Sequence, residues 1–197
     1  MRNIERAVRV AADAAVEYRR LTNSEAKQLL EQWKFINEPV EWGVTRARND
    51  RPIEVRAKVP VWNQSRERLY LDARINVDRP WQSHWVLTWG DKHHHERSAT
   101  IRRLDMRDDH ANPDGQVWGR ETHKHLWTVE DNNSWAYTPD AIPHDPAVPP
   151  VTPDDYRAIF EAFANEVRIF LGEEYVWNDP PLADFGVPGG TTMWEVP

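Results

Sequence analysis

The sequence predicts an α+β fold, with an antiparallel sheet of about five strands and with N-terminal helices and one C-terminal helix packed on it. Apolar residues recur every three or four positions near both ends of the chain and every second position in the middle. The chain of 197 residues shows no internal repeat, and it is long enough to bury a core of its own. We therefore expect one globular domain.

Residues 1–38 are predicted to form an N-terminal helical segment. A first helix is expected over residues 2–21, since Ile4, Val8 and Ala12 lie at helical spacing. A second helix should begin at Thr22, Asn23 or Ser24, which are good N-cap residues. It should continue through Ile36 and end before Pro39.

Residues 50–137 are predicted to form the antiparallel sheet core. The segments 53–61 and 69–77 alternate apolar and polar residues and are expected to pair as a hairpin, with the turn at residues 63–65. Further strands are expected at 81–89, 98–107 and 121–129. The alternation changes phase at Arg102–Arg103, which indicates a bulge, and residues 108–119 are expected to form a loop.

A proline-rich connector is predicted over residues 138–152, before a helix over 153–172 and an irregular tail over 173–197. Thr152 suits the N-cap of that helix and Pro153 its first position. Its apolar stripe should include Tyr156, Ile159, Phe160, Phe163, Val167 and Phe170. Gly172 is the expected terminator.

The composition narrows the possible chemistry. The sequence has no cysteine, which excludes disulfides, thiolate metal sites and a cysteine nucleophile. The N-terminus does not resemble a signal peptide, and no apolar run is long enough to span a bilayer. We expect a cytoplasmic protein without a membrane partner.

Charge is distributed unevenly around the net value of −7. Residues 40–127 contain 16 Lys and Arg against 13 Asp and Glu, whereas the rest of the chain contains 9 against 19. Seven of the eight histidines also lie in residues 40–127. This distribution is compatible with an anionic ligand bound by the middle of the chain, or with a surface of mixed charge. The 11 tryptophans suit a half-buried sheet or a surface that stacks bases or sugars.

His123-Lys124-His125 is the strongest candidate motif. Residues two apart on a strand point to the same side, so the two imidazoles should lie together, with their backbones roughly 6–7 Å apart. Such a pair can bind one metal ion or exchange protons with a bound phosphate. It can also be a half-buried rim of the sheet without a function.

Arg103, Asp105 and His110 form a second candidate group. Arg103 could hold a phosphate, and Asp105 could orient an imidazole. The pair could also be a structural bridge between strands. His110, in the expected loop, could reach His123 and His125 if the fourth and fifth strands pair. His93-His94-His95 indicates a solvated turn or a metal-binding loop, and no role is expected for His144.

Two resemblances extend this interpretation. His123-x-His125 followed by Glu130 resembles the first metal motif of the cupins, although the second cupin motif is missing. The order Arg103-x-Asp105, His110-x-Asn112, His123-x-His125 and Ala136-Tyr137 resembles small prokaryotic proteins suspected to be toxins of toxin–antitoxin or phage-defence loci. The second resemblance implies a nucleic-acid or nucleotide target, or a partner protein that masks the site.

Three hypotheses follow for function. The first is a toxin-like or defence-associated ribonuclease or phosphodiesterase, acting on RNA or a nucleotide, with His110, His123, His125, Arg103 and Asp105 as catalytic residues. The second is a non-enzymatic interaction module that binds a partner protein, such as an antitoxin or a subunit of a defence complex. The third is a cupin-like protein with a metal on His123 and His125. The cofactor is therefore expected to be either none or one divalent metal ion. The first hypothesis requires the histidines to converge, whereas the second predicts scattered histidines and an exposed apolar surface.

Overall fold

The computed structural model describes residues 20–49, 52–90, 98–138 and 151–183. Within these ranges the fold is mostly β, with nine strands in one mixed sheet and two helices. The predicted α+β fold with about five strands was therefore wrong. The first expected helix lies almost wholly outside the described residues, as do most of the proline-rich connector and the end of the tail.

In chain order the elements are α2 (Asn23–Glu31), β1 (Lys34–Ile36), β2 (Trp42–Arg46), β3 (Pro52–Asn63), β4 (Leu69–Asn76), β5 (Ser83–Gly90), β6 (Ser98–Ala111), β7 (Val117–Leu126), β8 (Trp135–Tyr137), α3 (Pro153–Glu166) and β9 (Ile169–Leu171). The strand order across the sheet is β8-β7-β6-β5-β4-β3-β1-β9, and β2 also pairs with β3. Strands β3 to β8 follow one another as antiparallel neighbours, which includes the predicted β3–β4 hairpin. The sheet is mixed because β9 runs parallel to β1.

Helix α2 begins as predicted but ends earlier. The Thr22 side chain and Glu25 form a reciprocal capping box, which satisfies free N–H groups at the helix start. The helix ends at Glu31, and the next residues, expected to be helical, form β1 instead. Strand β1 lies between β3 and β9 and pairs with both. These sheet hydrogen bonds replace the helical ones that the sequence pattern favours.

Helix α3 also begins as predicted and ends early. Thr152 forms a capping box with Asp155, and Pro153 occupies the first turn. The helix ends at Glu166 rather than at Gly172, since Arg168 adopts a left-handed conformation with φ of 57°. The chain then turns into β9, where Phe170 is exposed instead of lying on the helix stripe.

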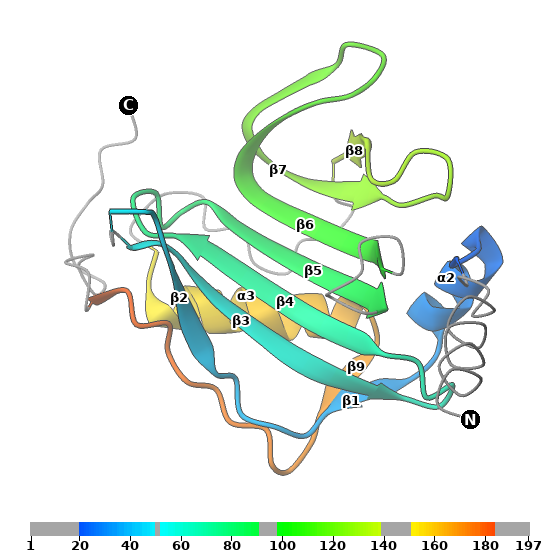
Figure 1. Cartoon of the computed structure of the whole chain (residues 1–197), viewed down its shortest axis with the longest axis horizontal. Helices are drawn as coiled ribbons and strands as arrows, with labels where there is room; N and C mark the ends of the chain where they lie inside the picture. The colour runs from blue at the N-terminus through cyan, green and yellow to red at the C-terminus, as the bar shows by residue number, and fades with distance from the viewer. Residues whose placement is uncertain (1–19, 50–51, 91–97, 139–150, 184–197) are drawn as a thin grey trace, which may run out of the picture.

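Helix α3 covers one face of the sheet, which is where the core lies (Figure 1). Tyr156, Ile159, Phe160 and Phe163 are buried on α3, and the Phe160 ring lies 6.2 Å from that of Trp85 on β5. The sheet contributes the alternating apolar residues of β3 to β6, among them Val55, Val59, Leu71, Ile75, Leu87, Leu104 and Met106. We refer to the opposite face of the sheet, which α3 does not cover, as the open face.

Strands β6 and β7 are long and bend away from the plane of the other strands (Figure 1). The phase change expected at Arg102–Arg103 is present. The pairing with β5 shifts there, because Leu87 pairs with Arg102 while Thr88 pairs with Thr100. As a result Leu104 and Met106 face the core, and Arg103 and Asp105 face the other way.

Among the described residues, no helix has the length and apolarity needed to cross a membrane.

The burial of Lys34 predicts how the stability of the protein depends on pH. Its side chain is 1% exposed, and its Nζ donates to the carbonyls of Leu29 at 2.5 Å and Gln32 at 2.7 Å. Burial, together with the charge of Arg168, lowers the pKa of Lys34 to about 8. Between pH 8 and the ordinary value of 10.5, the unfolded chain therefore binds more protons than the folded protein, so stability should rise with pH. The expected gain in the free energy of unfolding is ~3 kcal/mol.

Chemical denaturation across this pH range tests the prediction. Lys34→Met should remove the rise, while Lys27→Met, at a lysine that is exposed on α2, should retain it. The same pH dependence in the wild type and in Lys34→Met would contradict it.

Candidate functional site

The site is built around Asp105 on β6, whose neighbours come from the pairing of three strands. Asp105 pairs with His84 on β5 and with His123 on β7, so the three side chains form a row across the open face. One step along the sheet, Arg103 pairs with His125. The strand pairing thus places four polar side chains around one carboxylate.

The Asp105 carboxylate is 1% exposed and is surrounded by nitrogen atoms. Its Oδ1 accepts from His84 Nδ1 at 2.9 Å and from Arg103 Nε at 2.7 Å. Its Oδ2 lies 2.5 Å from Arg103 Nη2, 3.0 Å from His125 Nε2 and 3.5 Å from His123 Nε2. Burial alone would raise the pKa of Asp105, but the nearby nitrogen atoms of His123, His125, His84 and Arg103 outweigh it and hold the pKa well below its usual range. Asp105 is therefore a carboxylate at neutral pH.

His123 and His125 are fully buried, and main-chain carbonyls fix their proton positions. His123 Nδ1 lies 2.9 Å from the Glu121 carbonyl, and His125 Nδ1 lies 2.7 Å from the Asn133 carbonyl. A carbonyl only accepts, so each Nδ1 must carry its proton. The other nitrogen of His125, Nε2, lies 3.0 Å from Asp105 Oδ2, and a hydrogen bond between these two atoms requires a proton on Nε2. His123 Nε2 is buried and has no hydrogen-bond partner.

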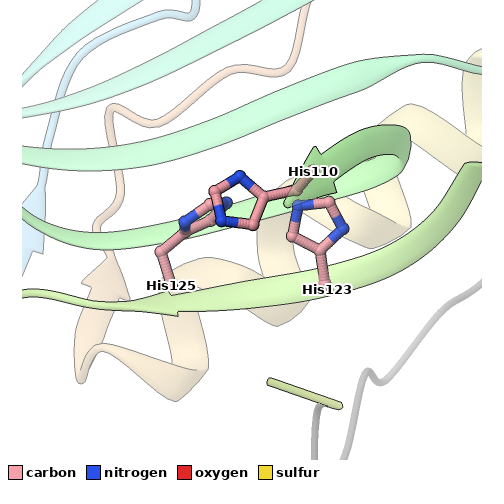
Figure 2. Close-up of side chains that lie close together, drawn as sticks. All are labelled: His110, His123 and His125. Carbon is pink, nitrogen blue, oxygen red and sulfur yellow. The ribbon is translucent and has the colours of Figure 1, made fainter. Parts of the chain in front are cut away.

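His110 completes the group from β6, not from the loop in which it was expected. Two shifts in the β6–β7 pairing lie between Asp105 and His110, and Arg107 and Arg120 near them have φ of 48° and 54°. These irregularities turn the His110 side chain toward the histidines of β7, and Figure 2 shows the three rings converging. The ring centroid of His110 lies 5.5 Å from that of His123 and 4.6 Å from that of His125.

The segment between β7 and β8 closes over the histidines. Its Asn133 carbonyl accepts from His125, and its Ser134 carbonyl lies 3.1 Å from His110 Nε2. Asn112 holds β8 in place, since its side chain donates to the Ala136 carbonyl and accepts from the Ala136 N–H. His110 is the one partly exposed member of the histidine group.

The arrangement places ring nitrogens of three histidines together beside a buried carboxylate. One ring nitrogen from each of the three histidines lies within 4.8 Å of the others, and Asp105 Oδ2 is close to two of them. Asp105 is already paired with Arg103 and His125, so the buried ring nitrogen of this group that lacks a partner is His123 Nε2. Histidines that bind metals usually donate their other N–H to a carbonyl or a carboxylate, as His123 and His125 do here. The histidine group therefore has the donor atoms and the outer hydrogen bonds of a metal site.

Comparison with known proteins gives a family without a known function. Residues 21–169 match the model of a family described as a family of unknown function, DUF6978. The chain belongs to DUF6978. No curated protein and no solved structure matches it.

The structure of this DUF6978 protein brings together all five residues that the sequence selected. His110, His123 and His125 converge, and Arg103 and Asp105 adjoin them. Glu130, the carboxylate of the cupin-like motif, instead accepts from Asn23 on α2. His93–His95 and His144 lie outside the described residues.

Sequence reasoning missed His84 as a member of the site. In the alternating sequence of residues 81–89 it takes the position next to Trp85, on the polar side, but only the register of β5 against β6 shows that it contacts Asp105. His84, Asp105 and Asp108 form a second group whose ligand atoms lie within 4.8 Å of one another, and His84 Nε2 lies 3.7 Å from Asp108 Oδ2. Asp105 thus joins the buried histidines to a partly exposed edge of the DUF6978 site.

The central position of Asp105 can be tested by removing its carboxylate. Asp105→Ala leaves Arg103 and His84 without the acceptor that each uses, and it creates a cavity. Removing one partner of a buried charged pair typically costs about 3–5 kcal/mol. We expect a loss of that size in the free energy of unfolding, measured by urea denaturation. The control is Asp114→Ala, at an exposed loop position, and an equally small loss in both variants would contradict the prediction.

Proposed function

We propose that this protein binds a divalent transition-metal ion with His110, His123 and His125, and that it acts as a metal-dependent phosphodiesterase of the ribonuclease class. The observation that carries the metal site is His123 Nε2, a buried ring nitrogen that has no hydrogen-bond partner and points into the space between the three rings (Figure 2). Imidazole nitrogens with an adjacent carboxylate suit Zn²⁺ and related ions.

Burial favours metal ligation over direct acid–base catalysis. A general acid or base must reach the substrate proton, within hydrogen-bond distance or through one water molecule. His123 and His125 are 0% exposed, and the segment between β7 and β8 contacts His125, so an RNA chain has no access to the two rings. A metal ion bound to both histidines would instead face the partly exposed side of His110, where a substrate has access.

The proposal of a hydrolase rests on the chemistry of the ligands and on the surroundings. A divalent ion on imidazole ligands lowers the pKa of bound water and stabilises charge on a phosphate. Asp105 orients His125, and the carbonyls of Glu121 and Asn133 hold the two histidines of β7 in one tautomer. Arg103 and His84, both partly exposed, place cationic and proton-donating groups beside the site. The resemblance to toxin-like and defence proteins supports a nucleic-acid target and a cytoplasmic location.

The interaction-module hypothesis is supported by one feature of the structure. Trp33, Phe35, Trp62 and Phe170 are all about half exposed, at 49–57%. The same hypothesis requires the histidines to scatter, and in this structure they converge. The metal-dependent enzyme accounts for the convergence, so we favour it. A partner protein such as an antitoxin or a defence-complex subunit remains compatible with it.

The metal site predicts a bound ion that depends on His123. Protein purified without an affinity tag and reconstituted with Zn²⁺ or Co²⁺ should retain about one ion per chain in elemental analysis. His123→Gln should weaken that binding by well over tenfold, because it removes a ligand that is already oriented. Chelation should lower the melting temperature of the wild type but not of the variant, since a ligand that binds only the folded state stabilises it.

The control is a triple variant with glutamine at His93, His94 and His95, which removes the histidine run of the sequence but leaves the buried group intact. It should bind metal like the wild type. If the triple variant loses the ion and His123→Gln retains it, or if the wild type takes up neither metal, the proposed centre does not exist.

Phosphodiesterase activity is a separate prediction. Metal-loaded protein should cleave single-stranded RNA, and a chelator or His110→Gln should reduce the rate to that of the buffer blank. The His93–His95 triple variant should cleave at the wild-type rate. RNA that stays intact with metal-loaded wild-type protein would refute the proposed enzyme and leave the metal site standing.

A further inference from the structure

The open face of the sheet carries an exposed aromatic row at the end where β1 and β9 lie. Phe35 on β1 pairs with Trp62 on β3 and with Phe170 on β9, so the three rings share one side of the sheet. They are 49%, 57% and 57% exposed. Trp33 adjoins them, with its ring centroid 4.7 Å from that of Phe170. Aromatic rings so exposed are costly to leave in water, which indicates a ligand with flat apolar surfaces.

Two pockets lie along this face. One, of about 460 Å³, is lined by Phe35, Trp62 and Tyr70 together with Arg66 and Arg68. The other, of about 310 Å³, is polar and is lined by Arg74, His84, Thr88, Thr100, Arg103 and Glu54. Tyr70 and Thr88 are paired residues of β4 and β5, so a lining residue of one pocket lies beside a lining residue of the other. Their linings contain four arginines against two glutamates, although the whole chain is acidic.

The Arg74 side chain indicates that the ligand of this face is an anion. Its neighbour Arg56 donates to Asp72 at 2.6 Å, and Arg103 holds Asp105. In the part of the chain that the structure describes, the Arg74 side chain makes no hydrogen bond or ion pair, and its Nε is buried without a partner. A buried guanidinium nitrogen without an acceptor costs free energy, and a phosphate oxygen would supply the acceptor.

We propose that the open face binds a single-stranded nucleic acid, with bases stacked on Trp62, Phe35 and Phe170 and a phosphate held by Arg74. Proteins that bind single strands combine aromatic platforms with a positively charged groove, and both features lie on this face. Tyr70 and Arg74 are four residues apart on β4, or about 13 Å, so one strand can contact both pockets. The bound strand would then end beside His84 and Arg103, which adjoin the candidate metal site. This inference names the substrate class of the proposed phosphodiesterase and in that sense rests on it, but the binding itself requires no metal.

Fluorescence anisotropy with a labelled 2′-O-methyl oligouridylate of about 12 nucleotides tests the inference, because this probe resists cleavage. Trp62→Ala should weaken binding by about fivefold to a hundredfold and leave its salt dependence unchanged, since stacking releases no counterions. Arg74→Met should weaken binding and also reduce the slope of log K against log salt by about 0.7, the value for one phosphate contact on a single strand. Matched controls are Leu126→Ala on β7 and Arg48→Met in an exposed turn, which should both bind like the wild type.

The experiment is run with and without a chelator, so that its result is independent of the metal site. Binding that survives chelation and is lost in Trp62→Ala and Arg74→Met supports the inference, even if no RNA is ever cleaved. Absence of binding by the wild type, or equal effects of the variants and their controls, overturns it. If the oligonucleotide does not bind and Trp62→Ala instead abolishes self-association in size-exclusion chromatography, the face is a protein-docking surface and the inference is wrong.

Discussion

The site depends on the ionised carboxylate of Asp105. Five nitrogen atoms from four side chains surround it at 2.5–3.5 Å, and those side chains come from three strands. A buried carboxylate without such partners would cost several kcal/mol, so the pairing of β5, β6 and β7 and the ionisation of Asp105 support each other. A shift of one residue in either pairing would move His84 or His123 to the opposite face of the sheet. The same interaction therefore fixes the strand register and the positions of the histidines.

The sequence revealed the long strands because alternation over eight or more residues is a strong signal. It did not reveal four short strands: β1, β8 and β9 have three residues each and β2 has five, which are too few positions to show a clear period. Lys34–Ile36 and Ile169–Leu171 were assigned to helices because each follows a helix whose apolar spacing continues into it. They are strands because they pair with each other across more than 130 residues of sequence and because β1 also pairs with β3. Such long-range pairing explains why the protein has a mixed sheet and not the predicted α+β fold.

The sequence predicted which residues belong to the candidate site better than it predicted how they contact one another. His123 and His125 belong to one face of one strand, and Arg103 and Asp105 to one face of another, so period-two reasoning grouped each pair correctly. The position of His110 depends on two irregularities in the β6–β7 pairing, where Arg107 and Arg120 are left-handed without being glycines. Sequence patterns carry no signal for that conformation in arginine. The contact of His84 with Asp105 likewise follows from a register that the sequence does not specify.

The two faces of the sheet differ in the residues that they carry. The face under α3 is apolar, and Lys124, which is buried there, is paired with Glu166 of α3. The open face has no helix over it among the described residues, and it holds Asp105, the unpartnered Nε of Arg74 and the exposed aromatic row. Polar groups left unsatisfied on a face cost stability, and so does exposed aromatic surface. Unsatisfied polar groups and exposed aromatic rings gather on the open face, whereas the face under α3 is packed as a core. This difference is expected if the open face is a binding surface on a rigid sheet.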